Sequence, residues 1–289
     1  MKILIIGNGF LATGIVQKLQ SEGHEILIFA RTRNMRIQNQ QVLGDIFDFR
    51  EFIKVFEWKP QVIIHTAWIT TPGIYKSDLS NFQYAEFTTN LAKFVINSEV
   101  EHLMILGTCA EYGYQKSSSK AGLTKLTPVT LYAQQKVVAF NSVNELMQNS
   151  KIRLTWARVF YPFGPDQDQK RLIPLLIKSL KNREPIVLGD ITSVYDWITT
   201  RDISLAISWI LKNDLPTEID VGTSFGFTNL ELLKALEKLL QIPYPQASLG
   251  IHHLGLEEVF IADKSSALFS SGWTPKDTIT SGLEWVLGN

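Results

Sequence analysis

Two side chains four residues apart, Tyr132 and Lys136, have the chemistry of an acid/base pair. Positions i and i+4 lie on one face of a helix, so a helix over this segment brings the phenol and the ammonium together. A phenol with its ordinary pKa of about 10 is a poor acid at neutral pH. A neighbouring ammonium and the positive charge of an oxidised nicotinamide favour the phenolate and lower that pKa. Such a tyrosine can protonate a carbonyl oxygen as hydride reaches the carbon, or assist the reverse.

The predicted elements around this pair place it at a site. Tyr132 opens an apolar helical pattern that runs to Met147, and Thr108 follows a predicted buried strand over residues 103–107. We therefore expect the Thr108 hydroxyl, Tyr132 and Lys136 to meet where a nicotinamide lies. The alternative is that Tyr132 and Lys136 are an ordinary pair on a helix surface.

The N-terminal segment predicts a dinucleotide-binding unit. Residues 2–6 form an apolar run typical of a buried parallel strand, and apolar residues recur at helical spacing up to Leu19. Between them a glycine turn lets the backbone approach a pyrophosphate at a helix N-terminus. We expect four positions of this turn to bind the cofactor: Gly7, Gly9, Phe10 and Leu11. The alternative is an α/β turn without a ligand.

The end of the second predicted strand, residues 25–29, indicates which dinucleotide binds. NAD sites usually carry an acidic residue there, which hydrogen-bonds the ribose 2′-hydroxyl. This chain has Ala30-Arg31-Thr32-Arg33 instead, and two guanidiniums suit a 2′-phosphate. We expect Arg31 and Arg33 to bind the cofactor, with NADP(H) preferred and NAD(H) possible. The alternative is that both arginines are solvated loop charges.

The composition excludes several classes of partner. Lys and Arg together number 28, as do Asp and Glu, and this balance points to neither nucleic acid nor an acidic membrane surface. Cys109 is the single cysteine, which fits a reducing compartment. The first strand begins at Lys2, no apolar run approaches the roughly 20 residues needed to span a bilayer, and no signal peptide is apparent. We expect a cytoplasmic protein whose partner is a small-molecule substrate.

Strands and helices are predicted to alternate along the first 160 residues. Further strands are expected at residues 42–46, 62–67, 103–107 and 152–159, and helices at 84–98 and 132–147. Such alternation predicts an α/β fold, a Rossmann-type doubly wound parallel sheet with helices on both faces.

The pattern changes at Tyr161, where proline and glycine residues interrupt it. The helices and short strands that follow predict a smaller, discontinuous C-terminal α/β substrate domain. We assign residues 1–160 to a dinucleotide-binding domain that also receives about 190–225. Residues 161–289 belong mainly to the substrate-binding domain.

A series of motifs spans nearly the whole chain. They are Gly7-x-Gly9-x-x-Ala12, Asp45-Ile46, His65-Thr66-Ala67, Asn90, Thr108, Tyr112-Gly113, Tyr132-x-x-x-Lys136, Gly164-Pro165, Leu172-Ile173-Pro174, residues 185–190, Asp196 and Ala262-Asp263. In their order and spacing the chain resembles the extended short-chain dehydrogenase/reductase family. The later motifs resemble its NAD(P)-dependent nucleotide-sugar branch of epimerases, dehydratases and 4-ketoreductases.

The resemblance implies a role for each matched position. Tyr132 would be the acid/base, Lys136 its electrostatic partner and a ribose ligand, and Thr108 would hold the reacting oxygen. Further cofactor contacts would come from Asp45 and Ile46 at the adenine and from Thr66 and Ala67 along the cofactor. Family members usually pair through the helices that correspond to 84–98 and 132–147, which implies a homodimer.

Departures from the family pattern narrow the expected reaction. The 4,6-dehydratases follow the strand-end threonine with Asp and Glu, whereas this chain has Cys109 and Ala110. GDP-fucose synthases carry an epimerising cysteine at the position of Ala110, one residue past Cys109. We interpret Cys109 as a small buried residue, and the alternative is a catalytic role. C4 epimerases recycle a bound NAD, whereas Arg31 and Arg33 suggest NADPH consumed as reductant. This comparison favours net reduction of a ketone.

The substrate anchors of the family are also altered. It often has an arginine where this chain has Tyr195, another near His253, and an asparagine at Tyr161. Arg171 could replace one anchor for the substrate's pyrophosphate. The expected substrate contacts are Thr108, Cys109, Ala110, Tyr161, Arg171, Tyr195 and His253.

The sequence thus predicts an NADPH-dependent reductase of the keto group of a nucleotide-linked 4-keto-6-deoxyhexose. The alternatives are a nucleotide-sugar epimerase, a reductase of a smaller carbonyl compound and a non-catalytic NADP(H)-binding sensor. His252, His253 and Glu257 have ligand-like spacing, but the chain offers no further ligand cluster, so we expect no metal.

Overall fold

The computed structural model describes residues 1–243, 247–249 and 257–288, and its main element is a large parallel β-sheet. Within these residues the sheet has seven strands. In spatial order they are β11 (Glu218–Val221), β6 (Arg153–Val159), β5 (His102–Thr108), β4 (Val62–His65), β1 (Lys2–Ile6), β2 (Glu25–Ala30) and β3 (Gln40–Leu43). The strand order reverses between β1 and β4, as in doubly wound folds, and this topology confirms the predicted fold class.

The sheet is buried on both faces, which is why its strands are continuous apolar runs. In β1, Ile3 and Ile5 join one hydrophobic cluster, and Leu4 and Ile6 join another. All four side chains are fully buried. The alternation of side chains along the strand therefore connects two cores on opposite faces of one sheet.

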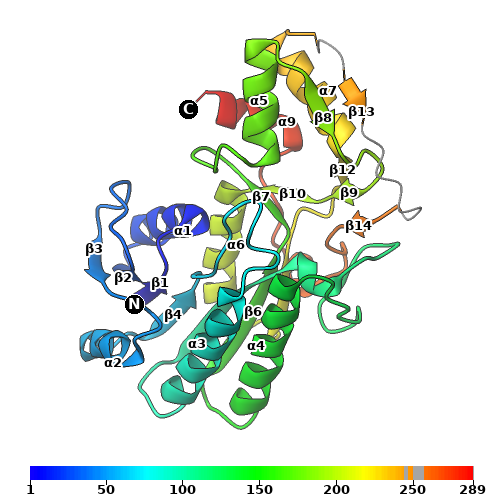
Figure 1. Cartoon of the computed structure of the whole chain (residues 1–289). Coiled ribbons are helices and arrows are strands. Elements are labelled where there is room, and N and C mark those ends of the chain that lie inside the picture. Colours follow the sequence, from blue (N-terminus) through cyan, green and yellow to red (C-terminus); the bar gives the residue numbers. More distant parts are fainter. Residues whose placement is uncertain (244–246, 250–256, 289) are drawn as a thin grey trace.

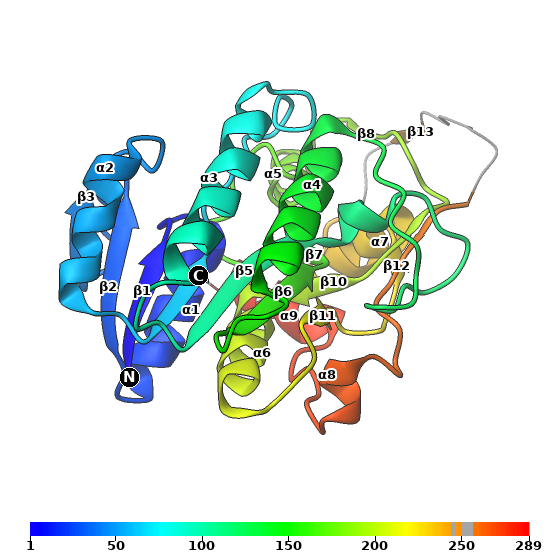
Figure 2. The ribbon, with the colours of Figure 1, turned by 90° about the horizontal axis from the view of Figure 1, so that it is seen from below.

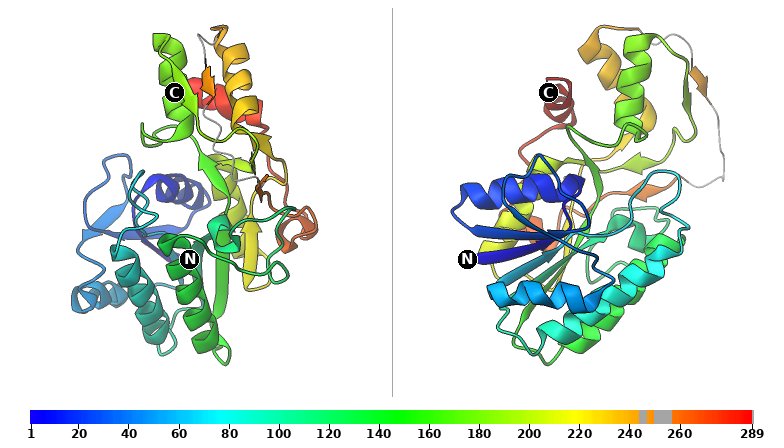
Figure 3. Two further views of the ribbon diagram at one scale, coloured as in Figure 1. Left: turned by 45° about the vertical axis from the view of Figure 1, so that its right-hand side comes forward. Right: turned by 60° about the vertical axis from the view of Figure 1, so that its left-hand side comes forward.

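Helices cover each face. On one side lie α1 (Phe10–Ser21), α6 (Thr200–Lys212) and α8 (Ala267–Ser270). On the other lie α2 (Phe49–Phe52), the 3-10 helix η1 (Ile53–Trp58), α3 (Ser80–Val95) and α4 (Leu131–Met147). Figure 2 shows α3 and α4 side by side, and the right-hand view of Figure 3 shows helices on the two faces of the sheet.

A smaller body stands above the carboxyl ends of the sheet strands (Figure 1). It contains α5 (Leu172–Asn182), α7 (Asn229–Leu240) and α9 (Ile279–Leu287), which enclose a third hydrophobic cluster. Short strands accompany them: β7 (Tyr161–Phe163) with β10 (Trp197–Thr199), β8 (Ile186–Leu188) with β13 (Ala247–Leu249), and β9 (Val194–Tyr195) between β12 (Phe227–Thr228) and β14 (Val259–Phe260). Between these pieces the chain returns to the large sheet through α6 and β11.

Most predicted elements are present, with shifted ends. The strand expected at 42–46 occupies Gln40–Leu43, and the one expected at 62–67 ends at His65. The segment between β3 and β4 contains two short helices, α2 and η1. Among the described residues, no helix is long and apolar enough to cross a bilayer.

The arrangement gathers four strand ends at one edge of the sheet. β1, β4, β5 and β6 end at Ile6, His65, Thr108 and Val159, and the loops that follow face the smaller body. Ligands of open α/β sheets bind at this edge, next to the point where the strand order reverses.

Candidate functional site

A cleft of about 720 Å³ lies along this edge, between the large sheet and the smaller body. It brings together most of the predicted site residues. Those lining it are Gly7, Gly9, Phe10, Leu11, Arg31, Ile46, Thr66, Ala67, Thr108, Cys109, Ala110, Tyr132, Tyr161, Arg171 and Tyr195. Segments far apart in the sequence thus converge on one cavity.

Three predicted residues point elsewhere, and one is outside the described residues. Arg33 lines a different cavity. Asp45 accepts a hydrogen bond from the backbone of Phe47 and so stabilises its own turn. Lys136 is buried under the cleft wall. His253 falls in the part of the chain that the structure does not describe.

The glycine turn has the shape of a pyrophosphate cradle. Gly7 adopts a φ of +99°, and a Cβ there would lie 2.7 Å from Oγ1 of Thr66, so only glycine fits against the end of β4. At Gly9 a Cβ would meet nothing within 4 Å. The open space beside Gly9 adjoins the start of α1, where amide groups are free to bind an anion. These residues fit a dinucleotide cofactor.

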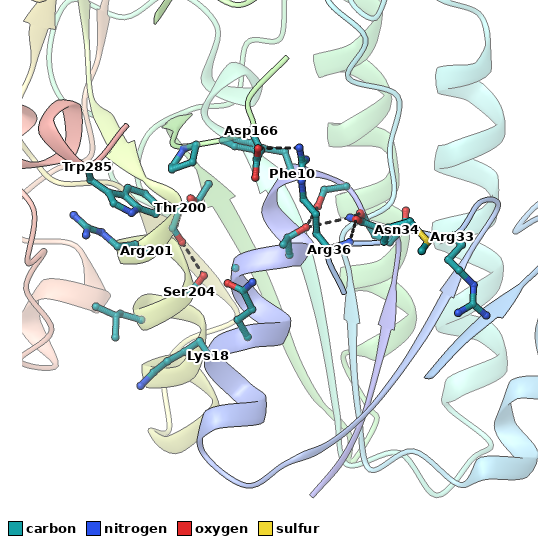
Figure 4. Close-up of a pocket in the computed structure, with 18 of the residues that line it drawn as sticks. Phe10, Lys18, Arg33, Asn34, Arg36, Asp166, Thr200, Arg201, Ser204 and Trp285 are labelled. Carbon is teal, nitrogen blue, oxygen red and sulfur yellow. Dashed lines mark hydrogen bonds and ion pairs between the residues drawn. The ribbon is translucent and has the colours of Figure 1, made fainter. Parts of the chain in front are cut away.

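The two arginines after β2 line different cavities. Arg31 lines the cleft, and its guanidinium donates a hydrogen bond of 3.3 Å to the hydroxyl of Tyr84. Arg33 lines a second cavity (Figure 4). The prediction that both guanidiniums bind one phosphate stays a prediction, since the two side chains line adjoining cavities.

Two amide side chains that the sequence did not predict, the half-buried Asn34 and the buried Gln41, join this loop to the glycine turn. The Asn34 side chain donates to the carbonyl of Asn8 (2.7 Å), and Gln41 accepts from the Asn34 backbone (2.9 Å) and donates to its carbonyl (2.8 Å). Nothing in the sequence distinguishes these amides from ordinary loop residues. These hydrogen bonds hold the loop that begins at Arg31 close to the glycine turn, where the cofactor is expected.

Tyr132 and Thr108, the residues predicted to react, both line the cleft. Tyr75 packs against the Tyr132 ring at 5.0 Å between centroids. Burial, assisted by Tyr75, raises the pKa of Tyr132 above its ordinary value, although the nearby Thr108 side chain acts in the opposite direction. The protein's own groups thus favour the protonated phenol, and the lowered pKa predicted beside an oxidised nicotinamide stays a prediction.

The Lys136 side chain does not line the cleft itself, but it contacts Trp68, which does. Its Nζ donates to the carbonyl of Leu106 at 2.6 Å and lies 3.8 Å from the ring centroid of Trp68. Burial lowers the pKa of Lys136 to about 7, against the attraction of Glu111. Trp68, a cleft residue that directly follows the matched motif His65-Thr66-Ala67, was not predicted.

A buried ionic network supports the strand end that carries Thr108. Glu111, the last acid before Tyr112, accepts from the Thr108 backbone at 2.9 Å and from Arg158 at 2.6 Å. Arg158 also binds Glu218 at 2.7 Å. The side chains of Glu111 and Arg158 are 0% exposed, so the carboxylate belongs to this network and not to the cleft.

The far end of the cleft is aromatic. Tyr161 contacts Tyr195, Trp197 and Phe260 at ring-centroid distances of 4.6, 5.4 and 5.7 Å. The hydroxyl of Tyr195 donates to Asp190 at 2.7 Å, and burial together with this carboxylate raises the pKa of Tyr195. The wall therefore offers ring faces where the family often has cations.

Two further substrate candidates have defined environments. Arg171 lies over the Tyr75 ring, 5.2 Å from its centroid, and donates to the carbonyl of Thr70. Cys109 is buried, and burial together with nearby carboxylates raises the pKa of its thiol. A thiol with a raised pKa is a weak nucleophile, which supports its interpretation as a small buried residue.

A second cavity of about 1370 Å³ lies outside α1, between α1, α6 and the loop after β2 (Figure 4). It has several cations, but most are paired. Arg36 binds Asp166 at 2.8 Å, Arg201 binds Asp277 at 2.6 Å, and Lys18 binds Glu22. We therefore place the site in the cleft.

The described ranges contain no group of three or more His, Cys, Asp or Glu residues that could hold a metal ion. His252 and His253 of the candidate metal spacing lie outside those ranges.

Comparison with known proteins agrees with this geometry. Residues 3–222 match the model of the NAD dependent epimerase/dehydratase family. The chain belongs to this family. Its membership confirms the resemblance to extended short-chain dehydrogenases/reductases and identifies the chain as an enzyme of the oxidoreductase type.

Similar proteins are mainly epimerases. The UDP-glucose 4-epimerase of Lactobacillus helveticus is 24% identical over 320 aligned residues, which cover 99% of this chain and 97% of that protein. Among solved structures, the Thermus thermophilus UDP-glucose 4-epimerase complex with NAD has a TM-score of 0.88 at 21% identity, covering 100% of this chain and 99% of that one. The dTDP-glucose 4,6-dehydratase of Bacillus anthracis in complex with NAD has a TM-score of 0.84 at 22% identity, covering 100% of this chain and 97% of that one. The epimerase alternative thus has more support than the predicted ketoreductase.

Proposed function

We propose that the chain is an NAD(P)-dependent nucleotide-sugar epimerase that acts at a carbon bearing a hydroxyl group. The observation that carries the proposal is that Thr108 and Tyr132 line the same cleft as the glycine turn. The similarity to UDP-glucose 4-epimerases over nearly the full chain supports it.

The proposed reaction is reversible oxidation at that carbon. A nicotinamide bound by the cleft would supply a hydride acceptor and, in the reverse step, a hydride donor. Tyr132 takes the hydroxyl proton of the sugar as the carbon is oxidised, and returns it to the oxygen after the keto sugar has turned its other face. Thr108 holds the reacting oxygen by hydrogen bonding, and the Lys136 ammonium favours the phenolate while the proton is away.

Different residues along the cleft would contact different parts of the cofactor. Gly7, Gly9, Phe10 and Leu11 would hold the pyrophosphate. Ile46 would contact the adenine, and Thr66 and Ala67 would line the middle of the cofactor. We assign residues 1–160 and about 190–225 to cofactor binding and the remainder to substrate binding.

The substrate contacts follow from the aromatic end of the cleft. Tyr161 and Tyr195 offer ring faces for a sugar or a base, and Arg171 is placed to neutralise a phosphate. His253 remains a proposed substrate contact. Dehydration is not proposed, because Cys109 and Ala110 stand beside Thr108 and the nearest carboxylate, Glu111, is held by Arg158.

A second candidate is an NADPH-dependent 4-ketoreductase of a nucleotide sugar. One observation favours it: β2 ends at Ala30 without an acid, and Arg31 lines the cleft beside it. A guanidinium there suits a 2′-phosphate better than a 2′-hydroxyl.

Two assays decide between these candidates. The purified chain is incubated with UDP-glucose, and with its dTDP, GDP and CDP counterparts, without added reductant, and the sugars are analysed by NMR. Conversion to a stereoisomer with no net change in cofactor supports the epimerase. Oxidation of NADPH that depends on a 4-keto nucleotide sugar, without isomerisation, favours the reductase. Failure of both reactions, with intact cofactor binding, would contradict the assignment to nucleotide sugars.

We also propose that two copies pair through α3 and α4. These helices lie next to each other at the surface, and apolar side chains near them are exposed, including Leu79, Phe82 and Val138. Pairing would remove this apolar surface from water.

A further inference from the structure

Trp68 lies between the acid/base tyrosine and the buried lysine. The Lys136 Nζ sits 3.8 Å from the centroid of the indole, and the Tyr132 ring meets the same indole edge-on at 6.3 Å between centroids. Both Trp68 and Lys136 are buried, with exposed fractions of 9% and 4%. Trp68 also lines the cleft, so one side chain contacts the lysine, the tyrosine and the cavity.

The indole is itself fixed. Its Nε1 donates to Asn81 at 2.7 Å, and its ring stacks on Tyr84 with centroids 5.5 Å apart. Asn81 is fully buried and in turn donates to the backbone carbonyls of Tyr75 and Asp78. An indole restrained on its edge and on its ring face presents a rigid surface to the ammonium.

The contact with the indole is important because the Lys136 ammonium has few other close partners. The charged and titratable groups that act on it across element boundaries are Glu111 from η2 (Cys109–Tyr112) and His65 from β4. Glu111 is already bound by Arg158, and burial together with Lys136 keeps His65 uncharged by lowering its pKa to about 3. Trp156, from β6, lies farther away, at 6.0 Å. The close contacts of Nζ are therefore the Leu106 carbonyl and the indole face of Trp68.

We propose that Trp68 is a positioning residue that holds the Lys136 ammonium on its ring face and keeps it charged behind Tyr132. An aromatic face attracts a cation most strongly where water is excluded. The inference rests on the proposed function for its link to catalysis, since it assigns a partner to the lysine of the proposed Tyr132–Lys136 pair.

The first test changes the indole electronically and leaves its shape intact. Fluorinated tryptophan, which has a weaker negative ring face, is incorporated into the full chain. The titration of Lys136 is followed by lysine side-chain NMR, and its signal is assigned with Lys136→Met. Because the cation–π contact favours the charged form, we expect the titration midpoint to fall by about 0.5–1 pH units with increasing fluorination. An unchanged midpoint would overturn the inference.

A matched pair of variants separates the ring face from the indole N–H. Trp68→Phe keeps an aromatic face but loses the hydrogen bond to Asn81, whereas Trp68→Leu loses both. We expect the Phe variant to keep most of the wild-type midpoint and the Leu variant to show the larger fall. Equal midpoints in the two variants would assign the effect to Asn81 and refute the role of the ring. The fluorinated protein decides the question if the Leu variant does not fold.

A functional measurement distinguishes this inference from the proposed function. The affinity for NADH is measured between pH 6 and 9 by fluorescence, and the epimerisation rate over the same range. If Trp68 acts through Lys136, NADH affinity and epimerisation rate should both decrease at high pH. The pH at which they decrease should shift together with the NMR titration midpoint of Lys136. If the NMR midpoint shifts on fluorination but NADH does not bind, the proposed function fails while the contact between Trp68 and Lys136 stands.

Discussion

At the scale of single residues, Tyr132 is held in its protonated form. Its surroundings are apolar, and the groups that lower its pKa are the Thr108 hydroxyl and, during the proposed reaction, positive charge beside it. The proposed epimerisation begins with the phenolate, so the positive charges of Lys136 and of an oxidised nicotinamide must offset these surroundings before Tyr132 can take the hydroxyl proton of the sugar and return it.

Removing the phenol hydroxyl tests this role. We expect Tyr132→Phe to lower kcat by about 10²–10⁴-fold, the usual range for a lost general acid/base. The ring contacts with Tyr75 and Trp68 remain, so the melting temperature and the NADH affinity should change little. Steady-state kinetics with the best nucleotide sugar is the measurement, and full activity of the variant would rule out the mechanism.

Alanine substitutions at the two glycines of the turn should differ in their effect on stability. A Cβ at Gly9 would meet no other atom within 4 Å, and the backbone φ of −75° suits alanine, so Gly9→Ala should fold normally. The new methyl group would stand where the cofactor passes, and we expect NADH affinity to fall by about tenfold or more. Isothermal titration measures the affinity. Gly7→Ala is the contrasting variant, because its Cβ would collide with Thr66 and lower stability as well.

Local sequence motifs were sufficient to place Thr108 and Tyr132 in the cleft, but they did not predict which side chains surround them. Thr108 and Tyr132 could be placed from the sequence because each stands at the end of a strongly patterned element. The contact of Lys136 with Trp68 could not, because it depends on side-chain packing between two distant segments. That Arg31 and Arg33 line different cavities was also not predicted, since it depends on how an irregular loop turns.

At the scale of elements, the end of β5 is held by buried charges. Glu111 fixes the backbone of Thr108 only while Arg158 neutralises it. Removing one partner of a buried ion pair leaves an uncompensated charge in a medium that solvates it poorly.

We therefore expect Arg158→Leu to destabilise the fold by about 3–5 kcal/mol, as measured by urea unfolding. The double variant Glu111→Gln with Arg158→Leu removes both charges and should recover a substantial part of that loss. A double variant as unstable as the single one would show that the arginine acts through packing alone, for example against Phe140.

The end of α1 is joined to α6 by Glu22, which predicts an acid-sensitive contact. Partial burial raises the pKa of Glu22, but hydrogen bonds from Lys212, Lys18 and Ser208 outweigh it and lower the pKa to about 2. A lowered folded-state pKa contributes stability above the unfolded value of about 4.5, and this contribution is lost as the pH falls toward 2. We expect about 1 kcal/mol, since the lysines are partly exposed. Comparing wild type with Glu22→Gln in urea at pH 7 and pH 3 checks this, and equal differences at both pH values would contradict it.

A long buried strand is easier to predict from the sequence than a strand of two residues. β1 could be read directly because both its faces are buried and its residues form one apolar run. The short strands β9, β12 and β14 could not, since two residues carry no periodicity and their pairing depends on segments more than thirty residues apart. The aromatic wall formed around Tyr161 is therefore a property of the fold more than of any local motif.

At the scale of the whole molecule, the proposed pairing of two chains can be measured directly. We expect a mass of about twice 32.7 kDa by light scattering. A charge on the exposed apolar surface near the start of α3, Phe82→Glu, should shift the equilibrium toward the monomer, because a buried unpaired charge opposes association. Leu123→Glu is a control, since Leu123 is also exposed but lies on a loop away from the two helices. A wild-type monomer at micromolar concentration would contradict the proposal.

The ion pair between Arg36 and Asp166 has a consequence for exchange of the cofactor. It joins the loop after β2 to the loop before α5, next to Phe10 (Figure 4), and both side chains are more than half exposed. An exposed pair contributes little free energy and is weakened by salt. It can open and close many times during the lifetime of a bound dinucleotide. The residence time of the cofactor will therefore be governed by the cleft itself, and it should depend only weakly on ionic strength.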